Sequence, residues 1–184
     1  MNMKKRIKLW DAHRPVNWLI VSTLVIVADQ ITKYLVVQQM GLFDSIRVLP
    51  HLNLTLLHNT GAAFSFLADA GGWQRWFFVL LGAGVSAFIL VWLRKMPAGQ
   101  GPLLPSSLSL ILGGALGNVI DRAIHGYVID FVDFYYGSWH FPAFNVADSA
   151  ITVGAALFIL DSIVDTHRAA AVKRKNSGNP GNQQ

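Results

Sequence analysis

The acidic side chains of this chain are all aspartates, and several stand in or beside long apolar segments. The sequence holds ten Asp and no Glu. A charge at the centre of a bilayer costs about 2.5–3.5 kcal/mol on insertion scales, so an acidic residue in an apolar segment marks a candidate functional site. The aspartates in such places are Asp29, Asp121, Asp130, Asp133 and Asp148.

Two aspartates that lie close together can carry out a hydrolysis with water as the nucleophile. Like charges about 3 Å apart cannot both ionise, so one carboxyl keeps a proton while the other acts as a base toward water. The protonated member donates to the carbonyl oxygen of the substrate. The residues alone favour no particular pair among Asp121, Asp130, Asp133 and Asp148. All four fall near the ends of the last two long apolar segments, on the side that the spans described below place outside the cytoplasm.

Other hydrolytic chemistries lack their characteristic residues. The chain has no Cys, and its six His show neither the spacing nor the neighbouring Glu of a metalloprotease helix. Ser86 and Ser149 are candidate nucleophiles, but no His in a predicted span offers a base. The sequence therefore predicts an aspartyl hydrolase, and we expect neither a metal nor an organic cofactor.

The composition places these aspartates in a membrane protein. Of 184 residues, 53% are hydrophobic and 14% charged, against roughly 25% charged in a soluble domain. Apolar runs long enough to cross a bilayer predict a mainly α fold with four transmembrane helices in one domain, 18–164. The predicted spans are 18–37, 76–93, 103–120 and 144–164. The flanking segments are a basic N-terminus, 1–17, and a polar tail, 165–184, expected to be disordered.

The basic residues predict the orientation of these spans. Eleven of the 15 Lys and Arg fall in the N-terminus, after the second span or in the tail, all on one side of a four-span arrangement. This positive-inside pattern predicts cytoplasmic termini, and it assigns the net charge of +5 to topology rather than to nucleic acid. The first apolar run continues through Asp29 and Lys33 without a small-residue cleavage site, so we expect a retained span rather than a removed signal peptide.

Two external segments, 38–75 and 121–143, are too long to be simple turns. Leucines at 52, 54 and 56 alternate with polar residues, which is the period of a half-buried strand. Tyr127–Tyr136 is rich in β-branched and aromatic residues and can pair with it. The sequence therefore predicts a small β-rich cradle at the outer membrane surface.

Five segments, in order along 18–164, resemble the signature blocks of lipoprotein signal peptidase, also called signal peptidase II. They are Asp29–Lys33, Asn59–Ser65, Gly113–Arg122, Val128–Asp133 and Phe144–Ser149. The resemblance implies a multi-pass aspartyl endopeptidase of the bacterial inner membrane, with Asp130 and Asp148 as its catalytic dyad near the periplasmic face. It implies that the enzyme cleaves signal peptides from prolipoproteins just before a diacylglyceryl-modified Cys. The implied partners are that substrate and membrane lipid, with no nucleic acid, and we expect a monomer.

The resemblance also implies supporting roles for other block residues. They hold the substrate or orient the dyad, and they are Asn59, Gly61, Asn118, Asp121, Arg122 and Asn145, with Asp29 and Lys33 on the first span. Other roles remain open for some of them: Asp121 and Arg122 can instead form a structural ion pair, and the glycines of Gly113–Gly117 can serve close helix packing. We expect Asp29 and Lys33, four residues apart, to pair, and residues 57–67 to cover the site.

Two other classes of protein place polar residues in spans. An ion-coupled transporter uses intramembrane Asp and Lys, and coupled uptake into sealed vesicles would identify it. A non-enzymatic assembly or anchor protein would use the glycines of Gly113–Gly117, a GxxxG pattern, for helix packing and aromatic residues at the membrane surface. If the chain were such a protein, substitutions of the aspartates would be nearly silent.

Overall fold

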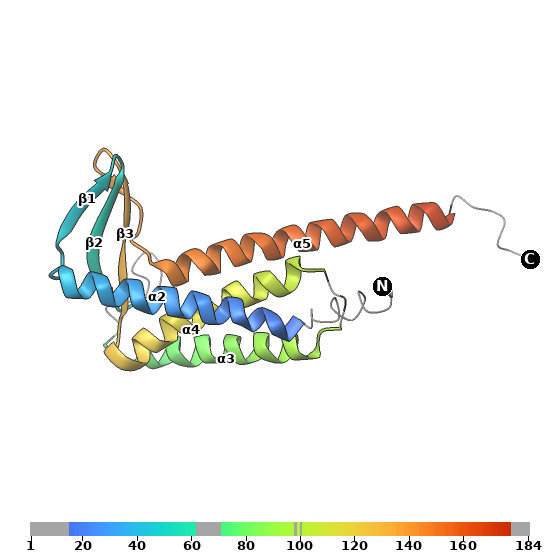
Figure 1. Cartoon of the computed structure of the whole chain (residues 1–184), viewed down its shortest axis with the longest axis horizontal. Coiled ribbons are helices and arrows are strands. Elements are labelled where there is room, and N and C mark those ends of the chain that lie inside the picture. Colours follow the sequence, from blue (N-terminus) through green and yellow to red (C-terminus); the bar gives the residue numbers. More distant parts are fainter. Residues whose placement is uncertain (1–14, 62–70, 98, 100, 178–184) are drawn as a thin grey trace, which may run out of the picture.

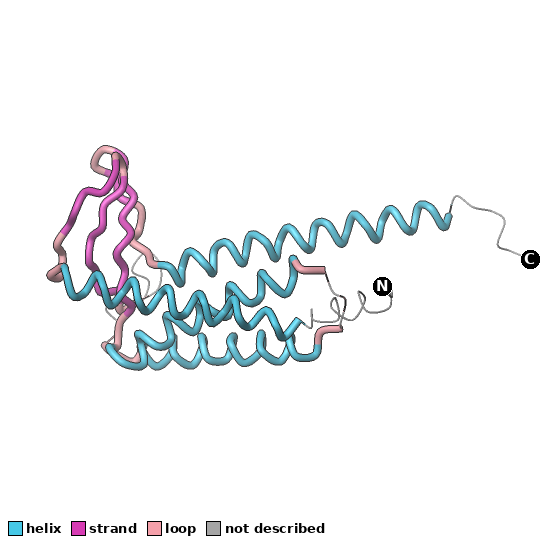
Figure 2. Tube along the Cα trace, in the orientation of Figure 1, coloured by secondary structure: helices cyan, strands magenta, loops and turns pink. Residues whose placement is uncertain are grey.

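The computed structural model describes residues 15–61, 71–97, 99 and 101–177. The helical elements are η1 (Pro15–Trp18), α2 (Leu19–Gln39), α3 (Gln74–Lys95), α4 (Leu103–His125) and α5 (Val146–Ser177). The strands are β1 (Ser45–Leu49), β2 (Leu52–Asn59), β3 (Val128–Tyr136) and β4 (Trp139–His140). The helices run alongside one another with the sheet at one end, and α5 projects beyond the others at the opposite end (Figures 1 and 2).

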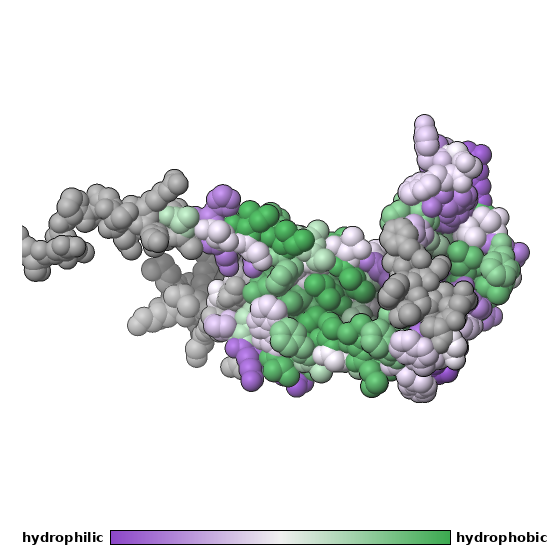
Figure 3. Space-filling view, turned by 180° about the vertical axis from the view of Figure 1, so that it is seen from behind, coloured by the Kyte–Doolittle hydropathy of each residue, from purple (hydrophilic) through white to green (hydrophobic). Residues whose placement is uncertain are grey.

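Four helical stretches in the described residues are long and apolar enough to cross a membrane. They are 15–39, 74–95, 103–125 and 146–167, and at 1.5 Å per residue each spans the roughly 30 Å of a bilayer core. Large apolar side chains point outward from them, as for Ile20, Leu80 and Phe88, which are 66%, 71% and 64% exposed. Figure 3 shows one such apolar surface over the helices. The predicted fold class, a four-span membrane protein with a small β-sheet, is confirmed.

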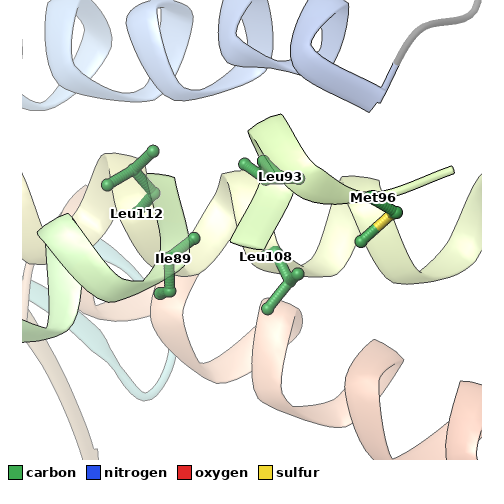
Figure 4. Packing of buried hydrophobic residues seen from close by; sticks show 5 residues of the cluster. All are labelled: Ile89, Leu93, Met96, Leu108 and Leu112. Carbon is green, nitrogen blue, oxygen red and sulfur yellow. The ribbon is translucent and has the colours of Figure 1, made fainter. Parts of the chain in front are cut away.

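Helix α4 is the centre of the bundle, and α2, α3 and α5 all pack against it. Half of its most apolar window is buried, against 17% for each of the other three. On one side Leu108 and Leu112 meet Ile89, Leu93 and Met96 in an apolar cluster (Figure 4). This central position explains how residues of α4 reach the elements on either side.

Glycines of α4 allow this close approach, so the predicted packing role of the GxxxG is confirmed. A Cβ atom at Gly113 would lie 2.8 Å from the carbonyl oxygen of Ser22 on α2. One at Gly117 would lie 2.7 Å from a carboxylate oxygen of Asp29. Both distances are shorter than the carbon–oxygen contacts that Cβ atoms make in proteins. Only glycine therefore permits α2 to lie this close to α4.

Replacing Gly114 by alanine is expected to lower the free energy of unfolding by about 1–3 kcal/mol. The new Cβ would meet the carbonyl oxygen of Ala147 and lie 2.7 Å from Cγ1 of Ile151, forcing α5 away from α4. Thermal unfolding in detergent measures the change. The matched control is Gly84→Ala on α3, where nothing lies within 4 Å; an equal loss in both variants would contradict the packing role.

The four strands form an antiparallel sheet in the order β1-β2-β3-β4. The predicted strand pairing is confirmed, since β2 pairs with β3 along Leu52↔Phe134 to Asn59↔Val128. The short outer strands β1 and β4 were not predicted. The β2–β3 register shifts between Leu54 and Leu57, and the backbone N–H groups of Phe131 and Val132 both donate to the carbonyl oxygen of Phe144. These features are typical of a β-bulge.

The C-terminal helix differs from its prediction. We expected a disordered tail from residue 165, but α5 continues to Ser177, so the prediction was wrong over 165–177. The polar character of this stretch indicated disorder, yet it is rich in Ala, Lys and Arg, which are strong helix formers. A helix already formed in the membrane also extends without a new nucleation step. Residues 178–184 lie outside the described part of the chain.

Candidate active site

Asp130 lies near the start of β3 and is only 3% exposed. Both of its carboxylate oxygens accept hydrogen bonds from amides. The side-chain nitrogen of Asn59, at the end of β2, donates to Oδ2 over 3.0 Å, and that of Asn145 donates to Oδ1 over 2.7 Å. Strand pairing of Leu57 with Asp130 brings Asn59 into reach. The carboxyl group is thus held from two sides, with its orientation set by the sheet and by the segment before α5.

Asp148 lies in the first turn of α5, which begins at Val146. Its Oδ1 accepts a 2.7 Å hydrogen bond from the amide of Asn118 on α4. Its backbone N–H donates to Oδ1 of Asn145 over 2.9 Å, the usual contact of a helix N-cap three residues earlier. Asn145, which has no exposed surface, therefore contacts Asp130 through its nitrogen and the backbone of Asp148 through its oxygen.

The electrostatic surroundings favour a proton on Asp130. Burial is the largest cause and the negative charge of Asp148 the next, and together they raise the pKa of Asp130 from 3.8 to about 7. The hydrogen bonds from Asn59 and Asn145 and the charge of Lys33 oppose this rise in pKa. A carboxyl that titrates near neutrality beside a second carboxyl is the condition that an acid–base pair requires.

A buried group of charges lies next to the two aspartates. Lys33 on α2 is 2% exposed, and its ammonium lies 2.8 Å from carboxylate oxygens of both Asp29 and Asp121. The predicted pairing of Asp29 with Lys33 is therefore confirmed. Lys33 also donates to Oδ1 of Asn118 over 3.3 Å. Because an ammonium only donates, this contact turns the Asn118 nitrogen toward Asp148.

The two aspartates of this group hold the backbone beside the candidate dyad. Asp29 accepts a 2.9 Å hydrogen bond from the N–H of Ala147, the residue before Asp148. Asp121 accepts a 3.1 Å bond from the N–H of Ile129, the residue before Asp130. One buried lysine thus connects two anchors, each placed one residue before a candidate catalytic side chain.

Gln30 belongs to the same group, although the sequence analysis assigned it no role. Its amide nitrogen donates to Oδ1 of Asp121 over 2.8 Å, to the carbonyl oxygen of Gly117 over 3.3 Å and to Asp29 over 3.3 Å. The sequence does carry a signal for this role, because Gln30 is a polar residue inside an apolar span and next to Asp29.

Arg122 holds the turn after β2. It donates to the carbonyl oxygen of Gly61 over 2.7 Å, and its guanidinium lies 4.9 Å from the ring centre of Phe78. The N–H of Gly61 in turn donates to Oδ1 of Asn59, so Arg122 supports the residue that contacts Asp130. In the described residues Asp121 pairs with Lys33 rather than with Arg122, and the alternative of an Asp121–Arg122 ion pair was wrong. The part of the expected cover at 62–67 lies outside the described residues.

Asp133 lies apart from the pair, in its own set of contacts. Its carboxylate accepts hydrogen bonds from Asn53 and Thr55, both over 3.2 Å, and from Nδ1 of His140 over 2.8 Å. Burial raises the pKa of Asp133, but the hydrogen bonds, led by that of His140, outweigh it and hold the pKa below its ordinary value. Asp133 is therefore ionised at neutral pH, and a carboxyl group with a lowered pKa is a poor partner for sharing a proton with Asp130.

A cavity of about 1370 Å³ connects these groups. Residues of the sheet line one part of it, and residues of α4 and α5 line the other. Asp130, Asp148 and Asp133 all face it. On a regular strand, residues 130 and 133 would point to opposite faces; the bulge beside Phe131 changes this alternation and brings both carboxylates into one cavity. Among the described residues, no group of three or more His or Asp is arranged to hold a metal ion.

The chain is similar in sequence to known proteins. A profile of signal peptidase (SPase) II matches residues 21–164. The chain is 57% identical over 145 residues to the lipoprotein signal peptidase of Alteromonas mediterranea, covering 79% of each chain. It is 54% identical over 152 residues to that of Shewanella loihica, covering 83% of this chain and 89% of the other.

Solved structures show the same fold. Two bacterial membrane enzymes, each 34% identical in sequence, superpose with TM-scores of 0.72 and 0.68. The first covers 82% of this chain and 89% of its own, and the second 79% and 91%. The match over residues 21–164 and the high identity to these relatives show the family: the chain belongs to the signal peptidase II family of membrane proteases.

Proposed function

We propose that this protein is an aspartyl endopeptidase that removes signal peptides from prolipoproteins, cleaving before a diacylglyceryl-modified Cys, with Asp130 and Asp148 as its dyad. The observation that carries the proposal is Asn145, which contacts the Asp130 carboxylate and the Asp148 backbone at once in a cavity beside the membrane spans. Relatives that are more than half identical are lipoprotein signal peptidases.

The reaction needs one proton shared between the two carboxyls. The ionised member takes a proton from water as the water oxygen bonds to the scissile carbonyl carbon, and the protonated member donates its proton to the carbonyl oxygen. The resulting diol then collapses: its C–N bond breaks, the amine leaves with the proton taken from water, and the other carboxyl regains its own proton. The products are a signal peptide with a free carboxylate and a lipoprotein with a free amine.

The amides around the pair support the ionised member. Asn59 and Asn145 donate to Asp130, and Asn118 donates to Asp148. Each aspartate therefore keeps a compensated charge when it is the base. Because the two carboxyls interact, their protons belong to the pair and come off in two joint steps.

The membrane orientation follows from charge. Arg94 and Lys95 end α3 at the end of the bundle away from the sheet (Figure 1). The positive-inside rule places that end in the cytoplasm, which in a bacterial inner membrane directs the sheet and the cavity toward the periplasm. Water reaches the dyad from that side, and the diacylglyceryl chains of the substrate remain in the bilayer, where each buried CH₂ contributes about 0.8 kcal/mol to anchoring.

The activity is expected to fall as the pH rises above about 7. The pKa of Asp130 is about 7, so the pair carries its shared proton below that pH and loses it above. The substitution Asn59→Leu removes a hydrogen bond that stabilises ionised Asp130, which raises its pKa and moves the alkaline limb of kcat upward in pH. Initial rates from pH 5 to 9 measure the limb. An alkaline limb that stays in place or moves downward in the variant would contradict this assignment.

Cleavage of matched substrates tests the proposed function. The purified protein in detergent is given one prolipoprotein in two forms, with and without the diacylglyceryl group on its Cys. We expect cleavage of the lipidated form only, because the lipid holds the scissile bond at the depth of the dyad. Equal cleavage of both forms would contradict the substrate class, and cleavage of neither by a folded protein would contradict the function.

A further inference from the structure

The cavity extends well beyond the proposed dyad. One part, the helix arm, is lined by Ile151, Thr152 and Val153 of α5. Another part, the sheet arm, is lined by residues of the strands, Ser45, Thr55, Asp133 and His140. The proposed catalytic mechanism uses neither arm. Asp133, which accepts hydrogen bonds from Asn53, Thr55 and His140, is a buried charged group without a role in that mechanism.

The two arms differ in what they can accept from a substrate. The helix arm belongs to a predicted membrane span and is mainly apolar, so it suits the apolar segment before the cleaved bond. The sheet arm lies outside the spans and is polar, so it suits the chain that follows the bond and enters water. A substrate held at Asp130 and Asp148 therefore runs from the helix arm to the sheet arm.

We propose that the sheet arm binds the first residues of the mature lipoprotein in extended form, and that Asp133 and His140 make it favour neutral or basic side chains over acidic ones. This inference rests on the proposed function. It adds a subsite for the product side of the cleaved bond, with an extended peptide as its ligand.

The chemistry of the pair determines this preference. A carboxylate only accepts hydrogen bonds, so the 2.8 Å contact places a hydrogen on Nδ1 of His140. The side chain of His140 is 53% exposed, and its ring is stacked on Tyr135 at 5.5 Å between centroids. Asp133, whose pKa lies below its ordinary value, brings a negative charge and acceptor oxygens to this part of the cavity, which attract peptide N–H groups and cations and repel carboxylates.

The position of the subsite follows from the strand. Asp133 is three residues from Asp130 along β3, which is about 10 Å at the rise of a strand. An extended substrate covers that distance in about three residues. We therefore expect the effect to be largest at the third or fourth residue of the mature chain, counting the lipidated Cys as the first.

The test compares lipidated prolipoproteins that carry Ser, Lys or Asp singly at the second, third and fourth mature positions. For the wild type we expect kcat/KM to be about fivefold lower with Asp than with Ser, the size of one charge interaction at a partly exposed site. Asp133→Asn removes the charge with little change in shape and should bring this ratio close to one. A merely structural role of Asp133 would lower the rates for all three substrates together and leave their ratio unchanged.

Two further variants complete the design. Asp44→Asn changes the net charge equally at an exposed site outside the cavity lining, and it should keep the wild-type ratio. Because His140→Gln leaves the charge of Asp133 in place, it should keep the wild-type ratio or increase it. Salt screens charges at partly exposed sites, so raising the salt concentration should lower the wild-type ratio, which provides a second route if Asp133→Asn does not fold. A wild type that cleaves the Asp and Ser substrates equally, or a ratio unaltered both by Asp133→Asn and by added salt, would overturn the subsite while leaving the proposed function intact. Absence of cleavage of every substrate would overturn both.

Discussion

Replacing Asp148 by asparagine is expected to reduce kcat at least about 10³-fold, within the range that acid–base groups contribute. Asparagine preserves the shape of the side chain but can neither take a proton from water nor share one with Asp130. Asp130→Asn should have the same effect, because the proposed mechanism needs both carboxyls for its proton transfers. Initial rates on a lipidated prolipoprotein measure the loss.

The loss must be separated from a loss of fold. The helix content and the unfolding temperature of each variant are compared with those of the wild type, and exposed Asp44 provides the control Asp44→Asn, which should retain full activity. A folded Asp148→Asn or Asp130→Asn protein that keeps more than a few per cent of wild-type kcat would remove that residue from the dyad.

Replacing Lys33 by methionine is expected to lower the free energy of unfolding by about 3–5 kcal/mol, the usual cost of leaving a buried charge without its partner. Methionine matches the apolar stem of lysine but leaves Asp29 and Asp121 facing each other without the ammonium that lies 2.8 Å from each. Activity should fall as well, because these aspartates anchor Ala147 and Ile129 beside the dyad. Thermal unfolding in detergent measures the stability.

Lys95→Met provides the control, since Lys95 is exposed at the end of α3 and its loss should change stability by less than about 0.5 kcal/mol. Adding Asp121→Asn to Lys33→Met should recover part of the stability by removing one uncompensated charge. An unchanged unfolding temperature in Lys33→Met would show that the buried charges do not support the fold.

The spans and the inner strands could be predicted because both depend on local patterns. Long apolar runs identify the four spans, and the alternation at 52–56 with the β-rich stretch after Tyr127 identifies β2 and β3. The short strands β1 and β4 have no comparable pattern. They form by pairing with neighbours already in place. The extension of α5 to Ser177 is not indicated by the polar composition of the tail, although its Ala, Lys and Arg residues favour a helix.

The candidate site was predictable in its residues but not in its arrangement. Asparagine and aspartate in the blocks indicated a polar site, but nothing local shows that Lys33 reaches Asn118, a contact across 85 positions. The bulge that turns Asp130 and Asp133 toward one cavity also depends on the backbone of Phe144, which lies further along the chain. The choice of Asp130 and Asp148 over Asp133 came from the resemblance, and the separate contacts of Asp133 now support it.

The family assignment also bears on the two other classes raised by the sequence. A transporter or an anchor protein would share the apolar spans and the close packing at Gly113 and Gly117. Neither class requires the arrangement in which the Asn145 side chain contacts both the Asp130 carboxylate and the Asp148 backbone. The match of residues 21–164 to signal peptidase II favours the protease over both.

Identification of the cleavage products tests the central proposal most directly. Purified wild type and the double variant Asp130→Asn/Asp148→Asn are incubated with a diacylglyceryl-modified prolipoprotein, and the products are identified by mass. We expect the wild type to yield a signal peptide with a free carboxylate and a lipoprotein that begins with the lipidated Cys, and the folded double variant to yield neither. Cleavage at another bond, or the same products from the double variant, would contradict it.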